Sequence, residues 1–261
     1  MSDAEILVTG GAGILGSKVV GRLRSAGIEP GVLSHSNRPG TIQGDLLTGE
    51  GLETAVRGVD TVVHCASSPF HKAHQTDVRG TQRLLAVASR AGVSHFVYIS
   101  IVGIDRVQSY PYYRVKLETE RLIEGSPIPH TILRATQFYE LVFMVVRALA
   151  RLPVVPVPKG LIGQPIAAGE VADRMVELTL SEPAGRVPDV GGPEVRTVEN
   201  VVRAYLNVTG IRKKAVTFPL PGKTAHAMRD GALTCPDNRY GKTRWEEFLR
   251  EGMDGYPGPR R

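Results

Sequence analysis

The sequence predicts an α/β protein built on a doubly wound parallel sheet, and two observations carry this prediction. Short apolar runs alternate with longer amphipathic segments through the first half of the chain, which is the pattern of parallel strands joined by crossover helices. The first unit, residues 6–23, also holds a glycine-rich turn between its apolar run and its helical pattern. With 261 residues, the chain is long enough for one such sheet and a smaller second region.

The glycine-rich turn is typical of a dinucleotide-binding site. Three glycines follow the apolar run Ile6–Val8 at three-residue intervals: Gly10, Gly13 and Gly16. One glycine permits the tight turn, another lets the backbone approach the phosphates, and the third lets the helix pack closely on the strand. The helix starts at Ile14 and Leu15, where free N–H groups attract an anion. We therefore expect this turn to hold a pyrophosphate; the alternative is a tight turn without a ligand.

The remaining elements of the first half continue the alternation of strands and helices. Strands are expected at residues 31–33, 61–65, 95–100 and 130–134. Helices are expected at residues 50–58, 77–91 and 112–123. Because each strand is followed by a helical pattern, the strands are expected to run parallel in one sheet.

The alternation of strand and helix patterns breaks off near residue 152. The run 152–158 contains three prolines, so a regular central strand is not expected there. Residues 170–181 and 198–209 again have helical patterns. We therefore divide the chain into a dinucleotide-binding domain, residues 1–151, and a smaller region, residues 152–261, that covers the first and is interleaved with it.

Composition is that of an ordinary soluble globular protein, with 22% charged and 42% hydrophobic residues. No apolar run approaches the ~20 residues that span a bilayer, and the N-terminus shows no signal peptide. The two cysteines lie far apart and suggest neither a disulfide framework nor a metal site. We therefore expect a cytoplasmic protein, a monomer or homodimer, without a metal site and without a membrane partner.

The net charge of +6 raises the question of nucleic acid. The basic residues are spread out, however, and the densest cluster is only Arg212, Lys213 and Lys214. The sequence lacks the interleaved aromatic and basic residues that stack on single strands. We therefore expect no nucleic-acid partner; the basic surface suits a phosphorylated cofactor, and the substrate is expected to be a small molecule.

Three further stretches now join the glycine turn. These are Gly44–Leu47 after the second strand, Tyr112–Lys116 at the start of a helix, and Thr131–Phe138. Together with the Thr-Gly-x-x-Gly-x-x-Gly motif at residues 9–16, they resemble the short-chain dehydrogenase/reductase superfamily, above all its extended and atypical branches with the NmrA-like proteins. The resemblance covers most of residues 4–140. It implies a Rossmann sheet with a small C-terminal substrate-binding region.

The resemblance also implies particular cofactor contacts. The three glycines, with Ile14 and Leu15 at the helix start, would hold the pyrophosphate. Asp45 would accept a hydrogen bond from the adenine amino group, with the backbone of Leu46 beside it. A role for Asp45 as a turn residue or helix cap remains the alternative.

Two later loops would complete the cofactor site that the resemblance implies. Ala66 and Ser67 follow the strand that ends near residue 65, and they would lie along the adenosine ribose and a nearby phosphate. Ala135 and Thr136 follow the strand that ends at residue 134, and they would flank the nicotinamide.

The loop after the second strand favours NADP over NAD. In NAD-specific Rossmann proteins an acidic residue near the end of this strand binds the ribose 2′-hydroxyl. Here Ser34, Ser36 and Arg38 occupy that place, and no carboxylate precedes Asp45. Hydroxyls and a guanidinium bind a 2′-phosphate, which a carboxylate would repel. We therefore expect NADP, with NAD as the second choice; Arg38 as a solvent-facing loop residue is the alternative.

Tyr112 and Lys116 are the candidate catalytic pair. Four residues apart, they lie one helical turn apart on the same face. In the family that the chain resembles, the lysine lowers the pKa of the tyrosine and binds the nicotinamide ribose. The tyrosine then donates a proton to the substrate oxygen as hydride arrives. An aromatic residue packed at a helix start beside a solvated lysine is the alternative.

The third catalytic group is less clear-cut in the sequence. The family places a hydroxyl one or two residues beyond position 100, where this chain has Ile101 and Val102. Ser100 is therefore the candidate that binds the substrate carbonyl. The alternatives are that Ser109 does so, that another group polarises the substrate, or that this chemistry does not take place. The apolar stretch 138–146 is expected to form core or a dimer surface, and the wall of a substrate pocket is the alternative.

Three functions are compatible with these residues. The first is an NADP-dependent oxidoreductase that transfers hydride between nicotinamide and a small carbonyl, enone or quinone-like substrate. The second is a non-catalytic, NmrA-like redox sensor that binds NADP. The third is an isomerase or dehydratase on the same fold. The retained Tyr112 and Lys116 favour the first, and it is our prediction.

Overall fold

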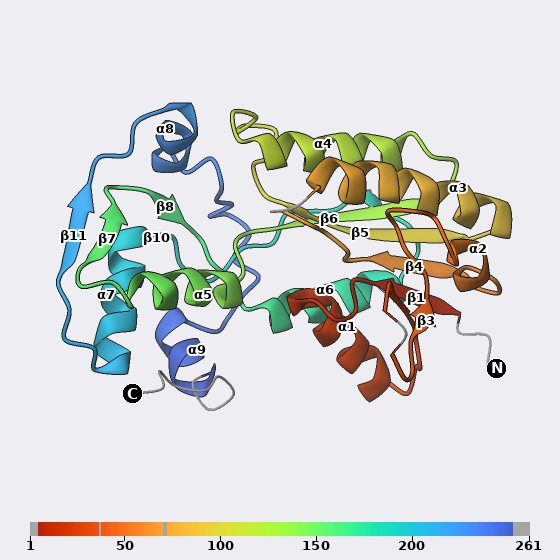
Figure 1. Cartoon of the computed structure of the whole chain (residues 1–261), viewed down its shortest axis with the longest axis horizontal. Helices are drawn as coiled ribbons and strands as arrows, with labels where there is room; N and C mark the ends of the chain where they lie inside the picture. The colour runs from red at the N-terminus through yellow and green to blue at the C-terminus, as the bar shows by residue number, and fades with distance from the viewer. Residues whose placement is uncertain (1–4, 37, 70–71, 253–261) are drawn as a thin grey trace.

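The computed structural model describes residues 5–36, 38–69 and 72–252, and it confirms the doubly wound α/β fold (Figure 1). Seven parallel strands form the central sheet in the order β3-β2-β1-β4-β5-β6-β9. Their bounds are Ile6–Thr9 (β1), Gly31–Ser34 (β2), Ile42–Gln43 (β3), Thr61–His64 (β4), His95–Ile101 (β5), His130–Ala135 (β6) and Gly185–Arg186 (β9).

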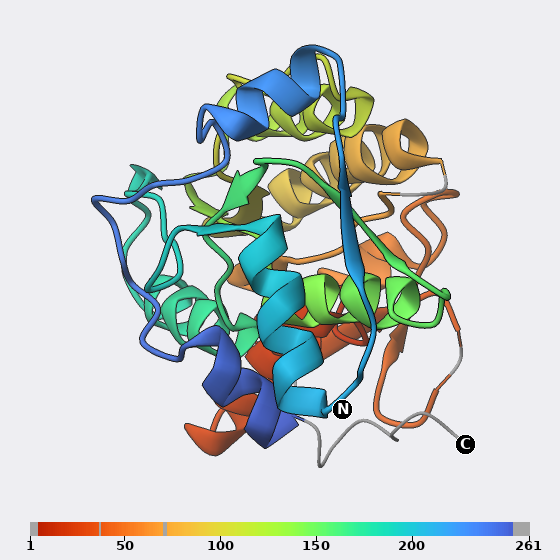
Figure 2. The ribbon, with the colours of Figure 1, turned by 90° about the vertical axis from the view of Figure 1, so that its left-hand side faces the viewer.

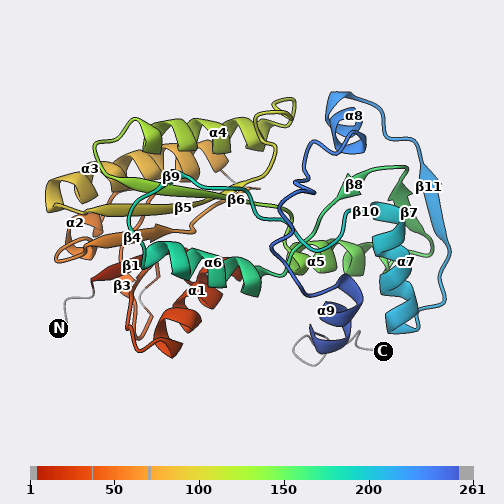
Figure 3. The ribbon, with the colours of Figure 1, turned by 180° about the vertical axis from the view of Figure 1, so that it is seen from behind.

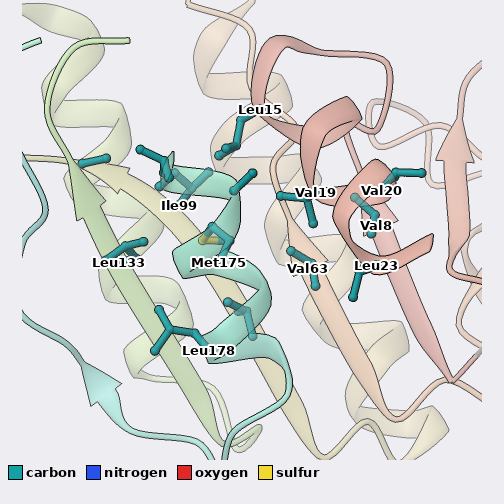
Figure 4. Close-up of a cluster of buried hydrophobic side chains, with 14 of the residues drawn as sticks. Val8, Leu15, Val19, Val20, Leu23, Val63, Ile99, Leu133, Met175 and Leu178 are labelled. Carbon is teal, nitrogen blue, oxygen red and sulfur yellow. The ribbon is translucent and has the colours of Figure 1, made fainter. Parts of the chain in front are cut away.

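Helices cover both faces of this sheet. One face carries α1 (Ile14–Ser25) and α6 (Ala168–Thr179), and the other carries α2 (Leu52–Ala55), α3 (Thr81–Ala91) and α4 (Pro111–Glu124). Because successive strand residues point to opposite faces, Val8 and Val63 pack against α1 and α6 (Figure 4). Their neighbours Leu7 and Val62 join the core on the other face. Each strand is therefore buried on both sides, which explains its continuous apolar run.

The strand order reverses between β1 and β4, which lie side by side although β2 and β3 separate them in sequence. From β1 the chain winds outward to β2 and β3, and it then returns to β4, β5 and β6 on the other side. Such a reversal leaves a crevice at the carboxyl ends of the strands, where open α/β sheets bind their ligands. The glycine turn follows β1 and therefore lies at this point.

A smaller lobe packs beside the sheet around its own core (Figure 3). Its main elements are α5 (Tyr139–Leu149), β7 (Val155–Pro158), α7 (Val198–Thr209), β11 (Ala215–Phe218) and α9 (Trp245–Gly252). The shorter ones are β8 (Ile162–Gly163), β10 (Arg196–Thr197) and α8 (Lys223–Arg229). Between β8 and β10 the chain returns to the main sheet as α6 and β9, so that the two parts are interleaved along the sequence.

The proline-rich run forms a strand, but one at the edge of a separate two-stranded sheet. β7 pairs in parallel with β11, and the amides of Val155 and Lys159 donate to Lys214 and Phe218. Pro156 and Pro158 alternate with these residues, so their missing N–H groups fall on the unpaired side. The expectation that this run would not be a regular central strand is therefore confirmed.

The expected helices are present, with two differences. The helix expected at residues 50–58 is a single turn, α2. The segment expected as a helix at 77–91 begins three residues earlier as a π-helical turn, η1 (His74–Gly80), which runs directly into α3. This turn moves Asp77 into the protein interior, where it is 1% exposed. No helix within the described ranges is both long and apolar enough to cross a bilayer.

Candidate active site

The glycine turn brings three backbone segments into contact. Gly10 has a positive φ of 69°, which favours glycine, and its amide-rich turn closes through Gly13 N–H donating to Gly10 O at 2.9 Å. A Cβ on Gly16 would lie only 2.2 Å from Gly10 O, so a side chain there would force α1 away from β1. No side chain caps the start of α1. The amides of its first turn, around Ile14 and Leu15, are therefore available to an anion.

A buried histidine fixes the loop after β4 to this turn. His64 lies between the hydroxyls of Thr9 and Thr81, with nitrogen–oxygen distances of 2.7 and 2.9 Å. Burial lowers the pKa of His64 to about 3, with a smaller contribution from Lys116, so the ring is neutral. The amide of Ala66 donates to the Thr9 hydroxyl at 3.3 Å. Ala66 therefore lies directly against the glycine turn, where the sequence predicted a cofactor contact.

The segments predicted to bind adenosine follow β2 and β3. Ser34 and Ser36 form a local turn, in which the Ser34 hydroxyl donates to Ser36 O at 2.9 Å, and Arg38 is exposed. Asp45 accepts the Leu47 amide at 2.7 Å through one carboxylate oxygen. The Leu46 side chain is buried in the core, and its carbonyl accepts a hydrogen bond from Arg83 at 3.3 Å. Asp45 thus makes the turn contact of the alternative interpretation, and its adenine contact stays a prediction.

Tyr112, Ser67 and Asp77 form a hydrogen-bonded cluster at the carboxyl edge of β4. The Ser67 hydroxyl donates to Asp77 Oδ1 at 2.8 Å and is within hydrogen-bond distance of the Tyr112 hydroxyl. The Tyr112 hydroxyl itself lies 3.5 Å from the same carboxylate oxygen. Asp77 Oδ2 accepts the Ser68 amide at 2.9 Å. Ser67 is exposed and Tyr112 is half-buried, so both are accessible from the crevice, with Asp77 behind them.

The cluster raises the pKa of Tyr112 above its usual value, chiefly through burial and next through the Asp77 carboxylate. The expectation that Lys116 lowers the pKa of this tyrosine stays a prediction, and the charged group that lies nearest the phenol is Asp77. Tyr112 keeps its proton at neutral pH and can donate it.

Lys116 lies on the same face of α4, one turn further into the protein. It is 3% exposed, its ammonium donates to Ile99 O at 2.9 Å, and it lies 4.1 Å from the centroid of the Tyr98 ring. Burial lowers the pKa of Lys116 to about 8, a shift that Asp77 and Glu120 partly offset. This ammonium has no direct contact with Tyr112 among the described bonds.

A buried ion pair holds α4 against the sheet. Arg134 in β6 donates two hydrogen bonds to Glu120, at 2.8 and 2.6 Å, and a third to Asp105 at 2.7 Å. The side chains of Arg134 and Glu120 are only 4% and 3% exposed. Because Glu120 follows Lys116 by one helical turn, this pair fixes the depth at which Lys116 and Tyr112 lie.

The remaining predicted residues are placed less favourably. Ser100 is 3% exposed, and its hydroxyl has no hydrogen-bond partner; the structure does not bring it to Tyr112. Ser109 instead pairs with Thr224 of α8 at 2.7 Å. Ala135 and Thr136 are buried, and the Thr136 hydroxyl donates to Gln164 O. Their contact with nicotinamide, and the role of Ser100, stay predictions.

The sequence analysis did not identify Asp77 as a site residue. It assigned Ser67 to the adenosine ribose and a nearby phosphate, whereas the structure places Ser67 beside Asp77 and Tyr112. One signal could have found the aspartate. It occupies the buried stripe of a helical pattern, together with Thr81, Leu84 and Ala88, and an ionisable residue on an apolar stripe marks a candidate functional site. No cluster of three or more potential metal ligands occurs within the described residues.

Comparison with known proteins agrees with this geometry. A family model described as NAD(P)H-binding matches residues 10–181. A (4-alkanoyl-5-oxo-2,5-dihydrofuran-3-yl)methyl phosphate reductase of Streptomyces griseus is 28% identical over 221 residues, which cover 78% of this chain and 74% of that protein. A nucleoside-diphosphate-sugar epimerase of Staphylococcus aureus has a TM-score of 0.78 over 94% of this chain and 99% of its own, at 17% identity.

Other relatives are matched over a shorter part. A photosystem II assembly factor of Trieres chinensis is 27% identical over 148 residues, which cover 52% of this chain and 46% of that protein. The matched part thus spans about half of this chain and somewhat less than half of that relative. The structural likeness at 17% identity concerns the fold alone.

Proposed function

This chain belongs to the NAD(P)H-binding family, in the atypical and extended branch of the short-chain dehydrogenase/reductase superfamily, and we propose that it is an NADP-dependent reductase of a small carbonyl, enone or quinone-like molecule. One observation supports the proposal above the others. The uncapped start of α1 and the Tyr112–Ser67–Asp77 cluster lie at the same carboxyl edge of the sheet, where a dinucleotide would reach from one to the other. A cytoplasmic location and a monomeric or homodimeric state complete the proposal.

The residues present fit such a cofactor. The amides that open α1 are free of side-chain caps, and the absence of a Cβ at Gly10 and Gly16 lets the loop after β4 and the start of α1 lie close against the turn. Arg38 is exposed in the loop that follows β2, where a guanidinium would bind a 2′-phosphate. When bound, the nicotinamide supplies a hydride to the substrate.

The protein's own residues then handle the proton. Tyr112 holds the proton that the substrate oxygen receives, because its hydroxyl is accessible and hydrogen-bonded to Ser67. Ser67 orients that hydroxyl and takes the place that the sequence assigned to Ser100. Lys116 lies on the same face of α4 as Tyr112. Its ammonium, which lies over the Tyr98 ring, contributes positive charge. Positioning of this kind supplies much of the rate when a quinone is reduced, since little carbonyl activation is needed.

Two variants test the proton donor. In single-turnover reduction of a quinone or enone, Tyr112→Phe should slow hydride transfer by a factor of about 10² to 10⁴, the usual contribution of a positioned acid. Its NADPH affinity should stay close to that of the wild type. Tyr113→Phe is the matched control, because the Tyr113 ring packs beside those of Tyr110 and Tyr112 but its hydroxyl takes no part in the hydrogen bonds described for the cluster. Equal rates for the two variants would remove Tyr112 from the mechanism.

Cofactor choice is tested at Arg38. The Arg38→Ala variant should weaken NADPH binding much more than NADH binding, because only NADPH carries the 2′-phosphate. Arg57→Ala, at an exposed arginine after α2, is the control and should change neither. Equal losses of the two cofactors in Arg38→Ala would contradict the phosphate contact.

The second candidate is a non-catalytic sensor that binds NADP. It is favoured by the burial of Ser100 and by the absence of a described contact between Lys116 and Tyr112. A photosystem II assembly factor among the relatives makes a role in assembling or signalling to other proteins a reasonable second choice. Tight NADPH binding without turnover of any substrate would favour this candidate, or the isomerase or dehydratase that the fold also allows.

A further inference from the structure

One stretch of the smaller lobe is basic and holds no acidic residue. Residues 200–229 contain six lysines and arginines and neither aspartate nor glutamate. They form most of α7, the turn after it, β11 and α8. Figure 2 looks onto this part of the molecule, where β11 runs beside α7, and contacts join the two elements. Basic residues that lie before and after the turn are therefore brought close together.

A pocket of about 730 Å³ lies between α7 and β11, and we call it the α7–β11 pocket. Arg203 and Asn207 line it from α7, and Arg212 and Lys214 line it from the turn that leads into β11. A volume of this size is typical of small-molecule sites. None of the lining residues belongs to the glycine turn or to the Tyr112 cluster. In Figure 1, α7 and β11 lie at the end of the molecule away from the main sheet.

Three basic side chains of this pocket have no partner in the part of the protein that the structure describes. Among the described residues, Arg203, Arg212 and Lys214 make neither an ion pair nor a side-chain hydrogen bond. Lys213 differs, because its ammonium donates to Ala150 O at the end of α5, at 2.8 Å. Like charges that line one pocket repel one another, so an anion placed between them would be stabilised by all three.

The acidic residue of the pocket does not neutralise these charges. Glu199 Oε1 accepts the Gly160 amide at 2.6 Å, and its other carboxylate oxygen is enclosed by protein. The adjacent pocket, which Arg203 also lines, is different. There Arg196 donates to both carboxylate oxygens of Glu246, at 2.6 and 2.8 Å. The lobe therefore pairs one arginine with a carboxylate and leaves the other available to a ligand.

The remaining lining of the pocket suits a carbon skeleton. Val157 of β7 and Leu206 of α7 form part of its wall, and both are buried in the core of the lobe. Ala215 and Thr217 line the pocket from β11, two residues apart on one face of the strand. None of the lining side chains is aromatic, so the bases of a nucleic acid would find nothing to stack on.

We propose that the α7–β11 pocket binds a small phosphorylated molecule. Its phosphate would lie between Arg203, Arg212 and Lys214, because guanidinium groups bind phosphate oxygens through paired, charge-assisted hydrogen bonds. Its carbon skeleton would cover the wall formed by Val157 and Leu206. A phosphate group, with nearly two negative charges at neutral pH, matches three unpaired positive side chains better than a carboxylate does. This inference is independent of the proposed reaction.

The test is an NMR titration of the full, ¹⁵N-labelled chain with phenyl phosphate, benzoate and inorganic phosphate at constant ionic strength. The amides of Asn207, Gly210 and Ala215 report binding in the pocket, and those of Gly13 and Ile14 report binding at the glycine turn. Phenyl phosphate should shift the pocket amides and bind about tenfold more tightly than benzoate, which carries the same ring on a single charge. Inorganic phosphate should bind more weakly than phenyl phosphate, because it has no ring to cover the apolar wall.

Variants identify the residues that hold the phosphate. Arg203→Gln/Arg212→Gln should weaken binding of phenyl phosphate on the order of 100-fold, about tenfold for each lost charge-assisted hydrogen bond. Arg57→Gln/Arg121→Gln removes the same charge from two exposed arginines of the other half and should bind like the wild type. Thermal melting shows whether each variant is folded, and Lys214→Gln, with an expected loss of about tenfold, replaces the double variant if that one is not.

Four outcomes would overturn the proposal. The first is that phenyl phosphate leaves the pocket amides unshifted, whether or not it binds at the glycine turn. The second is that the control variant loses as much affinity as the pocket variant. The third is that benzoate or inorganic phosphate binds as tightly as phenyl phosphate. The fourth is that only polyglutamate shifts the pocket amides, which would make an acidic protein the partner.

Discussion

The Asp77 carboxylate should control the proton affinity of Tyr112, and Asp77→Asn removes its charge while keeping the shape of the side chain. The Tyr112 hydroxyl and Asp77 Oδ1 are 3.5 Å apart. At that distance, two like charges in an effective dielectric of about 20 repel by roughly 5 kcal/mol, an upper limit that corresponds to about 3.5 pKa units. Since single neighbouring charges usually shift a pKa by about 1 to 3 units, we expect Asp77→Asn to lower the pKa of Tyr112 by about 2 units.

The assay is a pH titration of the protein labelled with ¹³C at the tyrosine Cζ, followed by NMR. The Tyr112→Phe variant identifies the resonance of Tyr112. In the wild type this resonance should not titrate near the usual tyrosine pKa of about 10, because burial and Asp77 raise the pKa of Tyr112. In Asp77→Asn the titration should move to markedly lower pH. The measurement needs neither cofactor nor substrate.

Glu118→Gln is the matched control for this titration. Glu118 lies on the same helix as Tyr112, but it is half exposed and pairs with His74 at 3.3 Å. Its neutralisation should leave the Tyr112 titration in place. If Asp77→Asn titrates like the wild type while remaining folded, the carboxylate does not set the state of Tyr112 and the reasoning fails. Ser67→Ala provides a second test if Asp77→Asn is unfolded, because it removes the bridging hydroxyl.

Three further predictions concern stability, each measured by urea unfolding. Gly16→Ala should destabilise the protein by about 1–3 kcal/mol through overpacking, since its Cβ would lie 2.2 Å from a carbonyl oxygen; Gly21→Ala on the same helix has open space around it and should stabilise by roughly 0.5–1 kcal/mol. Lys116 binds its proton more weakly in the folded state, with its pKa lowered from 10.5 to about 8, so the unfolded chain holds more protons above pH 8 and stability must rise with pH. Relative to Lys116→Met, the wild type should gain about 2 kcal/mol between pH 7 and about 9.5; no gain would mean that the ammonium is not desolvated. Glu120→Gln breaks the buried pair with β6 and should cost about 3–5 kcal/mol, whereas Glu29→Gln, in an exposed pair with an arginine, should cost less than about 1 kcal/mol; similar losses would contradict the assigned difference in burial.

The dinucleotide-binding half was predictable because its signals are local. A buried strand, three spaced glycines and a helical pattern lie within one short stretch of sequence, and the structure places β1, the turn and α1 there. The prolines of β7 were also informative, because a residue without an N–H can occupy only the unpaired side of a strand. In each case the residues that decide the outcome are neighbours in the chain.

The catalytic cluster was less predictable because its members come from distant segments. Ser67 and Tyr112 are separated by more than 40 residues, and no local pattern says that their hydroxyls meet. The motif at Tyr112 and Lys116 identified the helix, but the charge that acts on the tyrosine comes from Asp77 on another element. The exposed side of α5 is a similar case. Apolar residues occur both on the side of α5 that is buried with Phe143 in the core of the smaller lobe and on the side that is exposed. The sequence of this helix therefore does not show which side is buried.

The most direct test of the central claim is a titration of the purified protein with NADPH and with NADH, followed by cofactor fluorescence, after which a panel of quinones, enones and aldehydes is added. The account predicts that NADPH binds more tightly than NADH and is oxidised in the presence of at least one member of the panel. Failure to bind either cofactor would contradict the assignment of the glycine turn, and with it the whole account of the site.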